Sequence, residues 1–418
     1  MKVYKFGGAS VKDADGVRNL ANILRKDNNI GNVVVVISAM GKMTNYLEEV
    51  CHAYFKCDKE LLNPTLNRVR EFHYRIISEL GISCPRADVL IQNLEEILSE
   101  EPSLSYDYEY DRIVSFGEML STSIVSAYLE SIGIDNTFLD ARRLIRTDDN
   151  YRDANIDIEI SKELCNNYIT FNEGETKIYI TQGFIAGTLT NQTTTLGREG
   201  SDYSAAILAY LLNAENVTIW KDVPGIMNAD PNKYESTEII PLLSYKEAIE
   251  MAHYGAKVIH PKTIKPLENK NIALYVKSFL KPESEGSVIR KVDHPLNLVP
   301  IYIDKENQVL LTISPRDFSF IAEERLSDIF SIMAQYKIKL NMIQTSAISF
   351  TVCIDYHEDI FDAFIEEISN RFRVQYNLGV KLLTIRHYNQ SIIDKLIKDY
   401  KPLMEDRNRL TVQFVLDK

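Results

Sequence analysis

The sequence offers few residues that could cross-link the fold or hold a structural metal. Only five cysteines occur in 418 residues, an odd number with no C-x-x-C pair; they are Cys51, Cys57, Cys84, Cys165 and Cys353. This pattern is typical of reduced thiols in a cytosolic protein and argues against a disulfide framework or a zinc site. We therefore expect stability to come from packed cores.

Long apolar runs and an excess of positive charge are also missing. The run VVVVI at 33–37 is far too short to span a bilayer, and the first residues lack the pattern of a secretory leader. The net charge of −12 argues against nucleic acid or an anionic membrane as a partner, although it allows a local cationic pocket for a phosphorylated ligand. We expect a cytoplasmic protein.

Several widespread catalytic signatures are absent as well. The sequence has no H-E-x-x-H motif, no G-x-S-x-G motif and no G-x-x-x-x-G-K-[ST] signature. Phosphate chemistry in this chain would therefore need a glycine loop of another kind.

The order of sequence patterns indicates an α/β protein of more than one domain. With about 150 residues per domain, 418 residues predict two or three units. Strand patterns such as NVVVVISAM and KIYITQGFIAGT alternate with helical ones, which predicts a mostly parallel sheet in a three-layer αβα domain over 1–285. Residues 44–132 are largely helical and too long for one crossover, so we expect a helical insertion there.

The last third of the chain has a different character. A polar, proline-bearing stretch near 280–300 predicts a linker. Residues 296–418 then follow a β-α-β-β-α-β order and a shorter β-α-β echo, which predicts ferredoxin-like units, the second truncated or divergent. In this interpretation LVPIYID and QVLLTISP are separate strands, as are RVQYNL and VKLLTIRHY, and KPLME ends a helix.

The segment KFGGASVKD (5–13) joins a strand to a helix through two glycines. Such a turn brings backbone N–H groups to a helix N-terminus, which is a natural anion site, and Lys5 could add a positive charge for a transferring phosphate. A Gly-Gly pair after a strand is more often only a turn, so on this segment alone we favour the structural interpretation.

A second glycine-bearing turn, GREGSD (197–202), opens a later helix and strengthens the phosphate hypothesis. Arg198 can form a bidentate pair with a carboxylate or phosphate. Ser201 and Asp202 stand where helix N-cap residues are expected, so capping alone could explain them. Asp202 therefore has two open interpretations: a cap, or an acid that anchors a substrate ammonium group or orients a lysine.

Other polar side chains lie at predicted strand ends or helix starts, where structural roles compete with functional ones. Glu118 begins a helix, where the macrodipole favours an acid in any case. Ser38 and Thr44 follow a parallel strand, where crevices form in open sheets, but both residue types are usually turn formers. The segment GAKVIHP adds His260, to which we assign a structural hydrogen bond rather than catalysis.

Taken in order, five motifs resemble those of aspartate kinases of the amino-acid kinase superfamily: KFGGASV, SAMGKMTN, SFGEML, TQGFIAGT with GREGSDYSA, and WKDVPGIMNADP with GAKVIHP. The resemblance runs from Lys5 to about Phe279 and continues in the tail as ACT-type regulatory domains. It implies a monofunctional enzyme that uses ATP to convert L-aspartate to 4-phospho-L-aspartate, the first step of lysine, threonine and methionine biosynthesis. Mg²⁺ is expected to arrive with ATP.

The resemblance also implies a role for each matching residue. The side-chain carboxylate of aspartate is ionised at pH 7 and needs no general base, so the site must supply positive charge and alignment. Lys5 and Asp202 match catalytic positions, Lys5 on the transferring phosphate and Asp202 orienting the reacting groups. The other implied contacts are to aspartate, from Ser38, Thr44, Glu118 (ammonium), Phe184, Arg198 (α-carboxylate) and Ser201, and to the nucleotide, from Lys5, Gly7, Gly8, Ala9, Lys221, Asp222 and Lys257.

The chain departs from the family pattern at several places. Ala9 replaces the usual Thr and so removes a hydroxyl beside the phosphates, and Glu199 replaces the usual Gly of the second loop. Because a carboxylate would repel a triphosphate, we predict that Glu199 points to solvent. Nucleotide contacts are expected to differ in detail where Lys221, Met227 and Asn232 replace a Thr, an aromatic and a basic residue.

In the tail, Asn341 and Ala347 stand where lysine-inhibited relatives carry acids that grip the effector ammonium. Losing an acid from an ammonium site typically costs a few kcal/mol, which weakens the case for inhibition by lysine, and the identity of any amino-acid effector stays open. The resemblance further implies a homodimer or higher homo-oligomer. Two alternatives remain: another carboxylate kinase of the superfamily, and a catalytically weak amino-acid sensor, which Ala9, Glu199 and Lys221 would favour.

Overall fold

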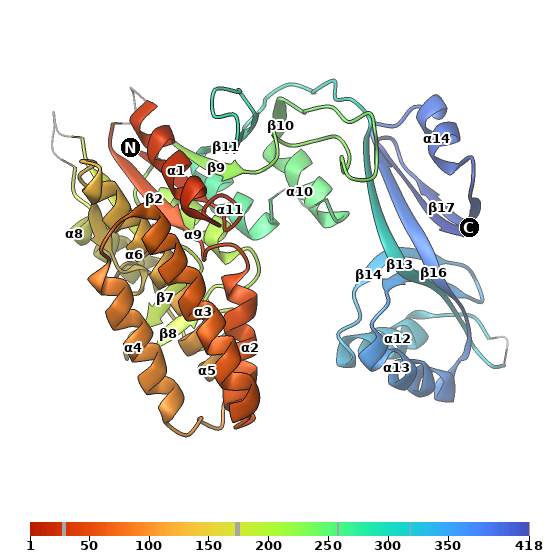
Figure 1. The fold of residues 1–418 in the computed structure, drawn as a ribbon. Helices are drawn as coiled ribbons and strands as arrows, with labels where there is room; N and C mark the ends of the chain where they lie inside the picture. The colour runs from red at the N-terminus through yellow and green to blue at the C-terminus, as the bar shows by residue number, and fades with distance from the viewer. Residues whose placement is uncertain (27–30, 172–175, 257–258, 318, 418) are drawn as a thin grey trace. The chain divides into compact units, whose positions relative to one another are not determined.

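The computed structural model describes residues 1–26, 31–171, 176–256, 259–317 and 319–417. The chain forms two compact units, each around its own sheet (Figure 1). The first unit consists of Met1–Ile226, Pro241–Ile249 and Val258–His294, and the second of Met227–Ile240, Glu250–Lys257 and Pro295–Lys418. The chain therefore passes between the units more than once.

The first unit is built on an eight-stranded sheet with the order β10-β12-β11-β9-β1-β2-β6-β3. All neighbouring strands are parallel except β11 and β12. The central strand β2 is buried at all five positions, as expected for a parallel strand covered on both faces. The strands are β1 (Lys2–Phe6), β2 (Val33–Ile37), β3 (Thr137–Leu139), β6 (Ile178–Gln182), β9 (Asn216–Lys221), β10 (Leu242–Ser244), β11 (Ala273–Ser278) and β12 (Ser287–Arg290).

Helices cover both faces of this sheet. Tyr4 and Phe6 of β1 share a core with α1 (Ala14–Lys26) and α6 (Phe116–Ser131). Because side chains alternate along a strand, Lys5 lies on the opposite face, where it meets α9 (Gly200–Leu211). Helix α11 (Pro261–Lys270) packs against α9. The predicted α/β class with a mostly parallel sheet is confirmed.

The predicted helical insertion is present between β2 and β3. Local signals set its helix ends: Asp58 accepts a hydrogen bond from the Leu61 N–H at the start of α3, and Gly81 ends that helix with φ of 69°. Its helices are α2 (Met43–Phe55), α3 (Lys59–Leu80), α4 (Pro85–Ser99), α5 (Tyr106–Val114) and α6.

A smaller four-stranded sheet, with the order β5-β4-β7-β8, completes the first unit. Its strands are β4 (Arg146–Thr147), β5 (Ile156–Asp157), β7 (Ile185–Thr188) and β8 (Thr193–Thr195), with α7 (Ala141–Leu144) and α8 (Ile158–Tyr168) beside them in the sequence. Helix α10 (Tyr245–His253) begins in the first unit and ends in the second.

The second unit is a six-stranded antiparallel sheet with the order β14-β15-β13-β16-β18-β17. Its strands are β13 (Ile301–Ser314), β14 (Leu340–Thr345), β15 (Phe350–Asp355), β16 (Arg373–Arg386), β17 (Lys401–Arg407) and β18 (Thr411–Asp417). Its helices are α12 (Glu323–Gln335), α13 (Glu358–Arg371) and α14 (Gln390–Ile397).

Two details of the predicted tail are wrong. The segments taken as four strands form two long ones, β13 and β16, which pair along their length with register shifts near Gln308. Asn307 and Gly379 adopt left-handed conformations there, with φ of 55° and 70°, so the polar residues that look like turns form an irregularity inside the ladder. The segment KPLME lies in strand β17, not in a helix; β17 is an edge strand, where Pro402 is tolerated.

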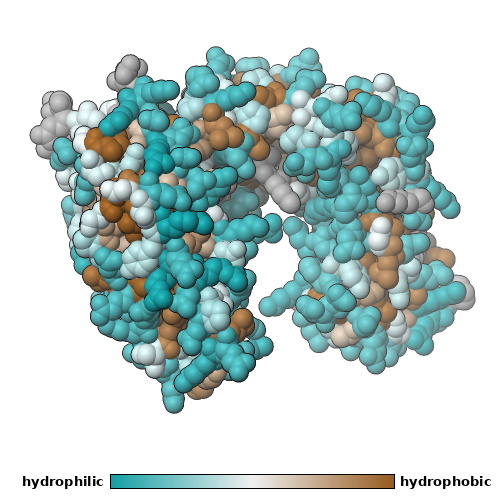
Figure 2. Space-filling view, in the orientation of Figure 1, coloured by the Kyte–Doolittle hydropathy of each residue, from teal (hydrophilic) through white to brown (hydrophobic). Residues whose placement is uncertain are grey.

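The visible surface is mainly hydrophilic (Figure 2), as expected for a chain in which 25% of the residues are charged. None of the helices in the described part of the chain has the length and apolar character needed to cross a bilayer.

Candidate functional site

The carboxyl ends of four neighbouring parallel strands meet at one edge of the large sheet. Phe6 lies opposite both Ile37 and Trp220, and Ile37 lies opposite Gln182. The segments that follow these residues therefore gather at this edge, which is where ligand crevices form in open α/β sheets. They carry Gly7, Gly8, Ala9, Ser38, Phe184, Lys221 and Asp222.

A buried carboxylate lies between two lysines at this edge. The Lys5 Nζ is 2.6 Å from Oδ1 of Asp202, and the Lys221 Nζ is 3.8 Å from Oδ2. Burial alone would raise the pKa of Asp202, but the two ammonium groups hold it below its usual value. Asp202 thus keeps its negative charge and fixes two positive charges next to each other.

The capping interpretation of Asp202 is wrong. Helix α9 has Glu199 as its N-cap residue, with no side-chain cap, and Ser201 and Asp202 lie inside the first turn. An acid in that turn is favoured by the helix dipole, and its lysine partners come from β1 and β9.

The first glycine loop packs closely on the loop after β2. A Cβ on Gly8 would lie 2.7 Å from the carbonyl oxygen of Ala39, and the Gly8 carbonyl accepts a hydrogen bond from the Gly41 N–H at 2.9 Å. The Gly7 carbonyl accepts the Ser10 N–H at 2.9 Å, so the glycines do form the expected turn. Ala9 is exposed at the tip of the loop.

Glu118 is a buried acid with only half of its carboxylate satisfied. Its Oε1 accepts the backbone N–H of Ala39 at 3.1 Å, whereas Oε2 has no hydrogen-bond partner in the described parts of the chain. Burial raises the pKa of Glu118 to about 8, against the opposing effects of hydrogen bonding and of Lys5. Such a group is ready to accept a cationic partner, because an ammonium would replace the proton that it holds at neutral pH.

The second glycine loop packs on the turn after β6. Phe184 has a left-handed backbone with φ of 66°, its N–H donates to the Ser204 hydroxyl, and its carbonyl accepts the Leu196 N–H. A Cβ on Gly200 would lie 2.6 Å from the Phe184 ring. Ser201 is buried against Gly183, so two predicted pocket residues, Phe184 of the turn and Ser201 of the loop, are fixed by close packing.

Arg198 and Glu199 are exposed residues of the same loop. Glu199 adopts φ of 54°, a conformation that favours glycine, which gives a physical reason for the glycine usual at this position. Its carboxylate accepts the backbone N–H of His260 at 3.0 Å. The His260 Nδ1 in turn accepts the Lys262 N–H and caps α11, the structural role expected for it.

The remaining predicted site residues are spread around the edge. Ser38 and Thr44 are half-buried, Ser38 directly after β2 and Thr44 in the first turn of α2, and Asp222 is exposed after β9. Lys257 lies outside the residues that the structure describes.

Comparison with known proteins is consistent with this geometry. The family model described as the amino acid kinase family matches residues 1–278, more than half of the chain. The chain belongs to the amino acid kinase family.

Among members of the amino acid kinase family, aspartokinases are similar to almost the whole chain. Lysine-sensitive aspartokinase 3 of Escherichia coli strain K12 is 31% identical over 397 residues, covering 92% of this chain and 86% of that protein. The aspartokinase of Chlamydia pneumoniae is 31% identical over 352 residues, covering 84% and 77%. The resemblance to aspartate kinases inferred from the motifs is confirmed.

Solved aspartokinase structures have the same fold. The T-state crystal structure of E. coli aspartokinase III with lysine and aspartate has a TM-score of 0.82 at 28% identity, covering 99% of this chain and 95% of that chain. The R-state structure of the same enzyme with aspartate and ADP has a TM-score of 0.81 at 28% identity, covering 100% and 96%.

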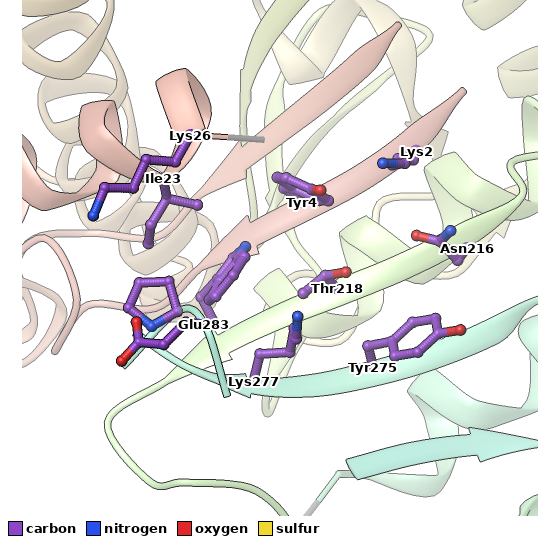
Figure 3. A pocket seen from close by; sticks show the side chains of 11 residues that line it. Lys2, Tyr4, Ile23, Lys26, Asn216, Thr218, Tyr275, Lys277 and Glu283 are labelled. Atoms are coloured by element: carbon purple, nitrogen blue, oxygen red, sulfur yellow. The ribbon is translucent and has the colours of Figure 1, made fainter. Parts of the chain in front are cut away.

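A separate cavity lies on the face of the eight-stranded sheet that is opposite to Lys5 and α9. It has a volume of about 470 Å³ and is lined by side chains such as Lys2, Tyr4, Thr218 and Lys277 (Figure 3). Along β1, Lys2 and Tyr4 alternate with Lys5 and so point away from it. The residues assigned to the kinase reaction are not among those lining this cavity, which we treat as distinct from the site.

The described residues contain no cluster of three or more His, Cys, Asp or Glu side chains arranged to hold a metal ion. The best-placed acid, Asp202, is occupied by two lysines. The arrangement suits a phosphorylated ligand better than a bare cation, because the charge left over from this triad is positive.

One buried acid near the site was missed from the sequence. Asp111 on α5 binds Thr195 and Arg152, and so contacts the strand that leads into the second glycine loop. Asp111 lies in the segment YDYEYDRIV, which carries several charged residues. Its position seven residues before Glu118 was the only local signal that it could lie near the site.

Proposed function

We propose that this chain transfers the γ-phosphoryl group of ATP to the side-chain carboxylate of L-aspartate, giving 4-phospho-L-aspartate and ADP. One observation carries the proposal: Lys5 and Lys221, from adjacent strands, are held together by the buried Asp202 at the strand edge that also carries both glycine loops. Membership of the family and the similarity to aspartokinases support the same reaction.

The chemistry asks for positive charge and alignment rather than for a base. The attacking oxygen of the aspartate carboxylate forms a bond to the γ-phosphorus while the bond to the bridging oxygen of ADP breaks. Negative charge shifts to the equatorial and leaving oxygens in the transition state. Lys5 and Lys221 are the positive groups that we assign to those oxygens, and Asp202 keeps both in place.

The first glycine loop supplies backbone donors for the phosphates. Gly8 allows the loop to approach Ala39 closely, and we assign the backbone amides of Gly7, Gly8 and Ala9 to the phosphate oxygens. Asp222, Lys221 and Lys257 are assigned to the nucleotide. Magnesium arrives with ATP, coordinated mainly by phosphate oxygens and water.

The amino-acid pocket is assigned to side chains around the second loop. Arg198 holds the α-carboxylate, and Oε2 of Glu118, which has no hydrogen-bond partner in the part of the chain that the structure describes, accepts the ammonium group. Ser38, Thr44, Phe184 and Ser201 line the pocket.

The tail is assigned a regulatory role. We assign residues 296–418 to the ACT-type region and residues 1–285 to the kinase domain. Strand β12 (Ser287–Arg290) lies just beyond this boundary and pairs with β10 and β11 of the eight-stranded sheet. We further propose a homodimer or larger homo-oligomer, with an amino-acid effector at the ACT region. The cysteines are free and four of the five are buried, which agrees with a reducing cytoplasm.

The test is a hydroxylamine trap for the acyl phosphate. The full chain is incubated with Mg-ATP and either aspartate, glutamate, N-acetylglutamate or acetate, and hydroxamate is measured. Hydroxamate from aspartate alone supports the proposal. Hydroxamate from another acid selects a different carboxylate kinase, and aspartate binding without any hydroxamate selects the sensor.

The Arg198→Ala variant tests the pocket assignment in the same assay. We expect a higher KM for aspartate and an unchanged KM for ATP, because the lost contact is to the α-carboxylate. An unchanged KM for aspartate would remove Arg198 from the pocket.

A further inference from the structure

The loop that carries Arg198 is short and is fastened on both sides. It begins at Thr195, the last residue of β8, and ends at Gly200, the first residue of α9. On the α9 side, the Glu199 carboxylate accepts the His260 N–H at 3.0 Å. Next to β8, Leu196 donates its N–H to the Phe184 carbonyl, and its own carbonyl accepts the Lys262 ammonium at 3.1 Å. The β8 end is also held by a buried carboxylate, that of Asp111.

Both carboxylate oxygens of Asp111 accept hydrogen bonds, from Thr195 at the start of the loop and from the segment that contains Arg152. Its Oδ1 accepts the Thr195 hydroxyl at 2.7 Å, and its Oδ2 accepts the Thr195 N–H at 2.8 Å and the Arg152 N–H at 3.0 Å. Asp111 and Thr195 are both fully buried. Three donors on one carboxylate fix its position, so helix α5 and the start of the loop are held in one geometry.

The segment 152–154 contacts the loop at two residues that precede Arg198, Thr195 and Gly197. The Ala154 N–H donates to the Thr195 carbonyl at 3.0 Å. Gly197 has φ of 74°, and a Cβ there would lie 2.6 Å from the Asp153 carboxylate and 3.2 Å from the Arg152 carbonyl. The residue that precedes Arg198 is therefore pressed against the segment that Asp111 holds, which leaves the loop little freedom to move independently.

We propose that Asp111 is a positioning residue for aspartate binding: by holding Thr195 and Arg152 together it sets the place of Arg198, three residues further along the loop. This inference rests on the proposed function, because it takes Arg198 as the ligand of the aspartate α-carboxylate. It gives the helical insertion a role in the reaction, since α5 carries Asp111 and the adjoining α6 carries Glu118.

A second buried acid on the same helix provides a matched control. Glu109 is also fully buried, but its Oε1 accepts the Ser103 N–H and its Oε2 lies 3.6 Å from Arg112. These two contacts are with the α4–α5 connection and with its own helix. Removing it should disturb α5 as much as removing Asp111 does, without releasing the Arg198 loop.

The experiment compares Asp111→Ala, Asp111→Asn, Thr195→Val and Glu109→Ala in the full chain, with hydroxamate formation as the assay. For Asp111→Ala we expect the KM for aspartate to rise by about 10- to 100-fold, because a displacement of roughly 1 Å can cost about that much, while the KM for ATP stays within about twofold. Glu109→Ala should leave both KM values within about twofold of the wild type, whatever it does to the melting temperature.

Asp111→Asn should restore most of the affinity. Its carbonyl oxygen can take the place of Oδ2 and accept both backbone N–H groups, while its amide donates to the Thr195 hydroxyl oxygen. Thr195→Val removes one of the three donors and should raise the KM for aspartate by about three- to tenfold. If Asp111→Ala does not fold, Thr195→Val decides, and an unchanged KM in that variant overturns the proposal.

Two further outcomes separate this inference from the proposed function. A wild-type chain that forms no hydroxamate overturns the proposed reaction; aspartate binding is then followed by calorimetry, and Asp111→Ala must still weaken it by about 10-fold or more. A wild-type chain that forms hydroxamate, with Asp111→Ala and Glu109→Ala showing the same KM for aspartate, overturns the positioning role alone.

Discussion

Aspartate binding should release a proton from Glu118. The pKa of this carboxyl is raised to about 8 by burial, so roughly nine-tenths of the free protein carries the proton at pH 7. An ammonium group placed against Oε2 would lower that pKa well below 7, because an opposite charge within about 4–6 Å favours the ionised form. We therefore expect the release of about 0.9 proton per aspartate at pH 7 and about 0.1 at pH 9.

The same linkage sets the pH dependence of the affinity. Ionising a carboxyl whose pKa lies about one unit above the pH costs about 1.4 kcal/mol, and this cost falls as the pH rises toward 8. The association constant for aspartate should thus rise about ninefold from pH 6 to 7, about fivefold from pH 7 to 8, and less than twofold from pH 8 to 9.

Calorimetry measures both quantities. Aspartate is titrated into the nucleotide-free protein in buffers of different ionisation enthalpy, and the slope of the observed enthalpy gives the number of protons. Glu118→Gln should bind more weakly and release no proton, whereas Glu109→Gln, which changes another fully buried acid, should behave like the wild type. Release of fewer than about 0.2 proton at pH 7, or the same release from Glu118→Gln, would refute the reasoning.

Three further predictions concern the glycine loop and the tail. Lys5→Ala should lower turnover by about 10²- to 10³-fold while the KM for aspartate stays within a few-fold, as measured by hydroxamate formation; unchanged turnover would remove Lys5 from the mechanism. Gly8→Ala should lower the free energy of unfolding by about 1–3 kcal/mol because its Cβ would overlap a neighbouring carbonyl, and the exposed Ala9→Thr should change it by less than about 0.5 kcal/mol; equal midpoints in urea for both variants would contradict this. L-Lysine should change activity by less than about twofold, since the Asn341 amide already binds the Lys305 ammonium at 2.8 Å; strong inhibition in the hydroxamate assay would show that an acid is not needed there.

The elements set by local patterns were predictable. The strand β2 is apolar throughout and is buried at every position. The turn at Gly7 and Gly8 forms because glycines allow the close approach of the two loops. The alternation of strands and helices was enough to predict a mostly parallel sheet, since a parallel pair needs a crossover between its strands.

The elements that depend on distant pairing were not predictable. Residues 305–308 and 377–379 look like turns because they are polar or contain glycine, but β13 and β16 pair through them with a register shift. Strand β17 was taken as the end of a helix because only its pairing with β18 makes it a strand. In each case the deciding hydrogen bonds come from the partner strand, which local composition does not specify.

The candidate site divides in the same way. The order of the glycine motifs and the identity of Lys5, Arg198 and Asp202 were determined by the sequence alone, because loop conformation and side-chain charge are local properties. Only the tertiary structure decided which groups meet. It placed Asp202 between two lysines, left one oxygen of Glu118 without a hydrogen-bond partner among the described residues and brought Asp111 to the Arg198 loop. Strand register and burial bring together residues that lie far apart in the chain.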